Sequence, residues 1–114
     1  MLGCYRMSDP RLAEYLEFLR FPSISTDPQR KDDVAACAGW LEQKLTGMGL
    51  ETRVVPTAGH PIVLAKNIHK PGRRTVMIYG HYDVQPVDPV DLWTSPPFEP
   101  RIEKEIVFAR GGGG

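Results

Sequence analysis

The chain has 114 residues, of which 41% are apolar and 25% are charged, values typical of one globular domain with a core. Fourteen basic and fourteen acidic residues cancel, which gives no electrostatic footprint for nucleic acid or for an anionic membrane surface. No apolar run reaches the length that crosses a bilayer. We therefore expect neither a nucleic-acid partner nor a membrane partner.

The start of the chain lacks the apolar stretch of a signal peptide, and we interpret residues 1–7 as an irregular leader before a domain at residues 8–114. The two cysteines, Cys4 and Cys37, lie far apart and outside any C-x-x-C pair. This spacing argues against a disulfide scaffold and against a structural zinc site of the thiolate type. The sequence therefore predicts a cytoplasmic protein.

Two helices are predicted in the first half of the chain. Ser8-Asp9-Pro10 provides a capping side chain and a proline for the first turn, and apolar residues follow at helical spacing until Pro22 stops the helix. A polar loop from Ser23 to Gln29 leads to a second helix, from about Lys31 to Gly47. The predicted buried stripe of this second helix consists of Val34, Cys37, Ala38, Leu41 and Leu45.

Strand-like segments follow the second helix. The pattern predicts strands at residues 51–55 and 62–68, and then a turn at Lys70-Pro71-Gly72-Arg73. A weaker strand is predicted at residues 106–108.

Two further segments bear on the position of a site. Thr75 to Tyr79 is a short continuous apolar run, which is typical of a strand buried on both faces of a helix-covered sheet. Five prolines between Pro86 and Pro100 predict a rigid, ordered loop or an exposed extended segment.

A candidate metal ligand follows the apolar run. His81 comes directly after Gly80, and active sites of open α/β sheets lie outside the carboxyl ends of the strands. In an extended chain residues i and i+2 point to the same side, which lets the carboxylate of Asp83 accept the N–H of the imidazole nitrogen that faces away from the metal. His-x-Asp alone equally fits a histidine that is simply hydrogen-bonded at a strand end.

The longer string is more specific. Residues 79–86, Tyr-Gly-His-Tyr-Asp-Val-Gln-Pro, with Leu92 to Pro100, closely resemble the first metal-ligand signature of a known hydrolase family. That family contains the acetylornithine deacetylases, succinyl-diaminopimelate desuccinylases, aminoacylases and carnosinase-type dipeptidases. The dipeptidase branch is the nearest, through Asp-Val-Gln-Pro and Trp-Thr-Ser-Pro-Pro-Phe, and the resemblance extends from the first helix to Arg110-Gly111.

The resemblance implies a fold, a cofactor and a reaction. Residues 8–114 would be the N-terminal part of a helix-covered, mixed-sheet (α/β) zinc-peptidase catalytic domain. The family uses two zinc ions to hydrolyse amide bonds of dipeptides or N-acyl amino acids, and a homodimer is expected only in a full-length member. His81 matches the first histidine ligand, and Asp83 matches the catalytic carboxylate that orients it.

The chain departs from the family pattern near its end. An aspartate that bridges the two metals belongs at the position of Gly114, and glycine offers no side-chain oxygen. One histidine does not hold zinc against water, because catalytic sites use three or more protein ligands. We therefore expect an incomplete domain, truncated before the bridging aspartate and without hydrolase activity by itself. Lys104-Glu105 also replaces a favoured Asp-Gly turn, which predicts a looser hairpin.

Two other functions stay open. The first is a binding module, because the segments 86–89 and 97–100 fit the P-x-x-P pattern that polyproline-reading domains recognise. The second is a non-catalytic partner that docks on a full-length relative through an unfinished sheet edge. Unpaired strand edges also lead us to expect marginal stability.

Four more side chains have structural interpretations. His60, in a Gly-His-Pro turn, is expected to face solvent. Trp93 and Phe98 are expected to anchor the proline-rich loop to the core, and Tyr82 is expected to pack away from the metal.

Overall fold

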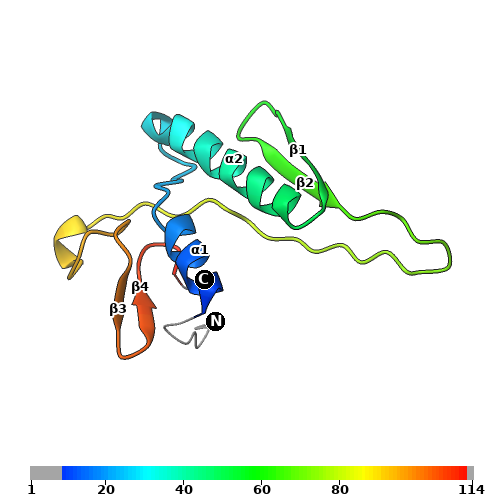
Figure 1. Ribbon diagram of the computed structural model, residues 1–114. Helices are drawn as coiled ribbons and strands as arrows, with labels where there is room; N and C mark the ends of the chain where they lie inside the picture. Colours follow the sequence, from blue (N-terminus) through cyan, green and yellow to red (C-terminus); the bar gives the residue numbers. More distant parts are fainter. Residues whose placement is uncertain (1–8, 113–114) are drawn as a thin grey trace.

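The computed structural model describes residues 9–112, and within that range it contains two helices, two short 3₁₀ turns and two antiparallel strand pairs (Figure 1). The predicted leader at residues 1–7 and the position of Gly114 lie outside the described range. The α/β class is confirmed. The helices and strands are α1 (Pro10–Phe18), α2 (Lys31–Gly47), β1 (Glu51–Val55), β2 (Ile62–Lys66), β3 (Arg101–Glu103) and β4 (Ile106–Phe108).

Helix α1 begins with the predicted cap. The Asp9 carboxylate accepts a hydrogen bond from the backbone N–H of Arg11 at 2.9 Å, and Pro10 occupies the first helical position. The helix ends at Phe18, so the predicted stop at Pro22 is too late. The intervening residues form a hydrogen-bonded turn, which ends the helical pattern before the proline is reached.

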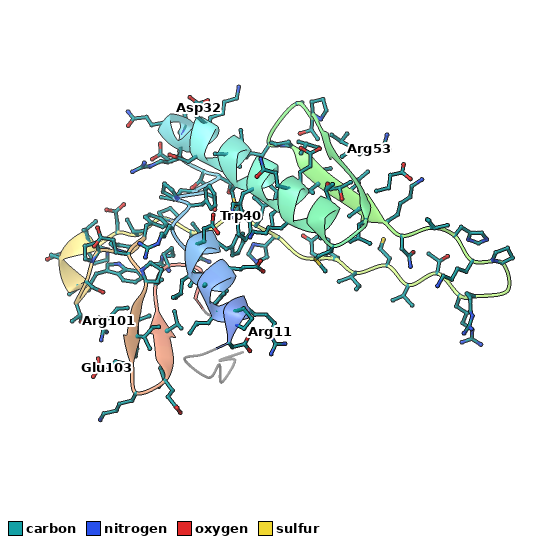
Figure 2. The ribbon with its side chains drawn as sticks, viewed as in Figure 1. Arg11, Asp32, Trp40, Arg53, Arg101 and Glu103 are labelled. Atoms are coloured by element: carbon teal, nitrogen blue, oxygen red, sulfur yellow. The ribbon has the colours of Figure 1, made fainter. Side chains whose placement is uncertain are left out.

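Helix α2 has the predicted bounds, and its inner face forms the centre of the core. Val34, Cys37 and Ala38 are fully buried, whereas the last two residues of the predicted stripe are half-buried. Trp40 extends from α2 toward α1, and its ring stacks on the Phe18 ring at a centroid distance of 5.6 Å (Figure 2). Further buried apolar side chains, Leu12, Leu19 and Ile24, come from α1 and the loop after it.

The strands form two separate pairs. β1 and β2 are antiparallel, with Glu51 opposite Lys66, and they lie beside α2 (Figure 1). β2 ends at Lys66, two residues before the predicted end of that strand. β4 matches the predicted strand and pairs with β3. Lys104 and Glu105 form the tight turn between them with φ values of +49° and +65°, so the hairpin forms without the Asp-Gly pair.

The prediction of a buried strand at Thr75–Tyr79 is wrong for this structure. The segment is unpaired, and its apolar side chains face solvent, with Ile78 92% exposed. A strand buried on both faces needs hydrogen-bonded neighbours and covering helices, and no segment within residues 9–112 supplies them. Figure 1 shows this segment as one limb of a long loop that extends away from the helices. The tip of that loop is the predicted turn, in which Arg73 N donates to Lys70 O at 3.1 Å.

The open shape leaves much surface in contact with water. The accessible surface is 9053 Å², whereas a compact chain of this mass exposes about 6,300 Å². The radius of gyration is 15.9 Å, against about 13 Å for a compact domain of this length. None of the helices among the described residues has both the length and the apolar character needed to cross a membrane.

Candidate metal centre

His81 and Asp83 lie on the same side of an extended stretch that follows the exposed loop. The Nδ1 atom of His81 is 2.9 Å from Asp83 Oδ1 and 3.1 Å from the backbone oxygen of Asp83. The His81 side chain is 71% exposed, and its Nε2 atom has no hydrogen-bond partner among residues 9–112. A carboxylate on Nδ1 keeps the N–H on that nitrogen, so the lone pair of Nε2 points outward. This is the arrangement that a histidine needs in order to bind a metal ion.

Asp83 has a second partner that the sequence did not indicate. The hydroxyl of Ser25 donates to Asp83 Oδ2 at 2.6 Å. Hydrogen bonds from Ser25 and then from His81 lower the pKa of Asp83, and they outweigh the opposing effect of partial burial. The carboxylate is therefore ionised at neutral pH, which is the form that accepts the imidazole N–H.

A short parallel pairing brings Ser25 to the site. Ile24 and Val84 form an isolated parallel bridge, and Val84 N donates to Ser23 O at 2.9 Å. The buried Ser23 hydroxyl donates to Tyr82 O at 2.8 Å. Residues 23–25 and 82–84 thus run side by side, which places the Ser25 hydroxyl opposite the Asp83 carboxylate.

The Gly-His-Pro turn also contacts this pairing, so the prediction that His60 faces solvent is wrong. His60 is half-buried, and its Nε2 donates to Ser25 O at 2.7 Å. The Tyr82 hydroxyl donates to Pro61 O at 2.5 Å, so Tyr82 packs on the turn as expected. Burial raises the pKa of the Tyr82 hydroxyl, with smaller contributions from Cys37 and Asp83.

The proline-rich loop is ordered and borders a separate cavity. Trp93 anchors it as predicted, because its Nε1 donates to Val87 O at 2.9 Å and the Arg110 guanidinium lies 4.8 Å from its ring centroid. Between this loop and the β3–β4 hairpin lies a cavity of about 570 Å³, and neither His81 nor Asp83 lines it. The cavity is therefore distinct from the candidate metal centre.

The described side chains can provide one ligand position of a metal site, but not a complete site. Within the described part of the chain, no three His, Cys, Asp or Glu side chains come together in a way that would hold a metal ion. A catalytic zinc site needs three protein ligands. His81 therefore fits a single ligand position, with Asp83 as the group that orients it.

Comparison with known proteins shows similarity to metallopeptidases and to a desuccinylase. No family model matches the chain. The chain is 34% identical over 118 residues to a Cys-Gly metallodipeptidase of Candida albicans, covering 90% of this chain and 24% of that protein. It is 29% identical over 102 residues to a succinyl-diaminopimelate desuccinylase of Azoarcus sp., covering 90% of this chain and 25% of that protein.

A solved structure shares both fold and sequence. The M20 family metallo-carboxypeptidase of Sulfolobus solfataricus superimposes with a TM-score of 0.79 and 38% identity, over 90% of this chain and 23% of that chain. The fold therefore matches part of an M20 peptidase domain, and the chain is a homologue of the M20 metallopeptidases, as the sequence predicted. The chain spans about a quarter of the length of the relatives that it matches.

Proposed function

We propose that this chain provides one ligand, His81, and its orienting carboxylate, Asp83, to a zinc centre that hydrolyses amide bonds. The observation that carries this proposal is the 2.9 Å contact between His81 Nδ1 and Asp83 Oδ1 on an exposed imidazole. The dipeptidase and desuccinylase among the relatives support dipeptides or N-acyl amino acids as substrates. Bound zinc supplies Lewis-acid polarisation of the scissile carbonyl and activation of a water molecule.

Each residue of the pair has a defined task in this proposal. His81 offers the Nε2 lone pair to the ion. Asp83 keeps the proton on Nδ1, holds the ring in one orientation and makes the imidazole a stronger base. Because the Ser25 hydroxyl and His81 lower its pKa, Asp83 performs this task throughout the neutral range.

The remaining ligands are assigned to residues outside the described range. In this proposal residues 8–114 are the N-terminal part of the catalytic domain, and a polypeptide with a single histidine ligand does not hydrolyse amides. The cytoplasmic location stays a prediction from the sequence. The homodimer, expected only in a full-length member of the family, stays a prediction from the resemblance.

Zinc titration by calorimetry tests the ligand role. The test compares the wild-type chain with His81→Ala and with His69→Ala, a matched control because His69 is also exposed and has no oriented partner among the described residues. Because one histidine without further protein ligands binds zinc only weakly, we expect a weak association in the wild type, which His81→Ala loses and His69→Ala keeps. Equal zinc binding by His81→Ala and the wild type would refute the ligand role.

Hydrolysis of Cys-Gly tests the incompleteness of the site. We expect the 114-residue polypeptide with zinc to release no more product than zinc alone. Product that the wild-type polypeptide forms and His81→Ala does not would contradict the assignment of the remaining ligands to other residues.

The exposed apolar segment favours a second candidate function, docking by strand addition. Residues 76–79 present apolar side chains and an unpaired backbone, which a strand of another chain can pair with. About three quarters of the Candida albicans relative lies outside the region that this chain matches. Docking would be supported if the wild-type chain co-purifies with the Candida albicans relative and the Ile78→Asp variant does not. The polyproline alternative is less well supported, because Pro97 is buried and Pro97 O accepts a bond from Arg110 N.

A further inference from the structure

We propose that Ser25 is a positioning residue for the metal ligand, which acts on His81 through Asp83. The hydroxyl of Ser25 sets the orientation of the Asp83 carboxylate, and the carboxylate sets the orientation and the tautomer of the imidazole. The inference rests on the proposed function only in so far as His81 is a ligand. The hydrogen bonds themselves are properties of the chain without any metal.

The two oxygens of Asp83 have different partners. Oδ2 accepts from Ser25 Oγ at 2.6 Å, and Oδ1 faces His81 Nδ1 at 2.9 Å. The terminal torsion of an aspartate is soft, so a carboxylate with one partner turns over a wide range. Two charge-assisted bonds on opposite oxygens fix the plane of the carboxylate. The Ser25 hydroxyl therefore determines where the other oxygen is presented to His81.

The backbone of Ser25 is itself fixed by a hydrogen bond from the Gly-His-Pro turn. Its carbonyl oxygen accepts the bond from His60 Nε2, while the Tyr82 hydroxyl donates to Pro61 O in the same turn. The His60 carbonyl in turn accepts from the Thr57 hydroxyl at 2.6 Å. A closed ring of hydrogen bonds thus joins Ser25, the turn and the Tyr82–Asp83 segment. This ring holds the carboxylate in place before any ion binds, which is the preorganisation that a ligand-orienting group requires.

A purely structural role for Ser25 makes a different prediction. If the hydroxyl only joins two segments, its loss weakens the fold but leaves the proton on His81 Nδ1. If it orients Asp83, its loss releases the carboxylate and leaves Nδ1 with only the backbone oxygen of Asp83, a neutral acceptor at 3.1 Å. Bonds to ionised acceptors are roughly twice as strong as neutral ones. The Nδ1–H tautomer then loses its preference.

The test is a tautomer measurement on the full 114-residue chain without metal. Long-range ¹H–¹⁵N spectra of histidine-labelled protein at about pH 8, where an ordinary imidazole is neutral, show which ring nitrogen carries the proton. We expect His81 of the wild type to be predominantly Nδ1–H, and Ser25→Ala to make this the minor form. Ser25→Thr restores the hydroxyl and should restore the wild-type tautomer. Thr26→Ala removes a neighbouring exposed hydroxyl and should have no effect.

Several outcomes would overturn the inference. An Nε2–H tautomer in the wild type refutes it without any variant. A folded Ser25→Ala, judged by unchanged His60 signals, with His81 still Nδ1–H refutes it as well. If Ser25→Ala does not fold, Ser25→Cys retains the volume with only a weak donor and must show the same tautomer shift. Because no metal is present, these results are independent of the zinc titration that tests the proposed function.

Discussion

Replacing Gly111 by alanine tests how firmly the chain after β4 packs against the candidate site. Gly111 has a φ of +83°, and an added Cβ would lie 3.0 Å from Val84 Cγ1 and 3.7 Å from Leu19 Cδ2. Val84 directly follows Asp83 and is bonded through its N–H to Ser23 O. A shift of Val84 therefore acts on the segment that carries the Asp83 carboxylate.

The expected loss of stability has two parts. A side chain in the left-handed region costs about 1–2 kcal/mol, and a forced contact in a packed region adds about 1–3 kcal/mol. Gly111→Ala should therefore lower the free energy of unfolding by about 2–5 kcal/mol. Gly49→Ala is the matched control, because Gly49 has a φ of +86° but no atom within 4 Å of an added Cβ. The control should show only the backbone part, about 1–2 kcal/mol.

Urea unfolding followed by circular dichroism measures both variants against the wild type. The difference between Gly111→Ala and Gly49→Ala isolates the contact with Val84. If Gly111→Ala loses no more stability than Gly49→Ala, the segment after β4 does not pack on the site as described, and the reasoning fails.

Three further predictions concern other parts of the chain. The double substitution Lys104→Asn and Glu105→Gly places residues that favour positive φ in the tight turn. It should raise the free energy of unfolding, measured by urea denaturation, by about 1 kcal/mol. An unchanged urea midpoint would count against the left-handed geometry of the turn. Burial raises the pKa of Cys37 to about 11, above the usual value near 9.0, so the unfolded chain loses the thiol proton first. The contribution of Cys37 to stability should be complete below about pH 9 and fall by up to about 1.4 kcal/mol per pH unit until about pH 11. Cys37→Ser should reduce the slope, and the part that remains comes from Tyr82, whose pKa burial also raises. Because Ile78 is exposed, Ile78→Asp should change the free energy of unfolding by less than about 0.5 kcal/mol. Val34 is in the core, so Val34→Ala should lower the free energy of unfolding by at least about 1 kcal/mol. A large loss for Ile78→Asp would mean that the Ile78 side chain is buried in a core.

Local features of the fold were predictable from the sequence. The bounds of α2 follow from helical spacing and from glycines at its end, and β1 follows from a change of period. The contact between His81 and Asp83 was equally local, because two residues in an extended stretch share one side. In each case the interacting residues are neighbours in sequence, so the pattern itself contains the information.

Contacts between distant segments were not predictable. Ser25 and Asp83 are 58 positions apart, and Ser25 and His60 are 35 positions apart, so no spacing rule connects them. The sequence therefore gives no sign that Ser25, in its polar loop, has a role at the site, and it predicts that His60 faces solvent. The apolar run at Thr75–Tyr79 expresses a preference for burial, but burial depends on neighbouring strands that residues 9–112 do not provide.

The most direct test of the central claim is a site-resolved zinc titration of the three histidines by ¹⁵N NMR. His81 presents an oriented, exposed Nε2, whereas His60 Nε2 already donates to Ser25 O and His69 has no orienting carboxylate among the described residues. We predict that the His81 Nε2 signal responds at the lowest zinc concentration and that Asp83→Asn weakens this response about tenfold or more. A first response at His69, or an unchanged His81 response in Asp83→Asn, would contradict it.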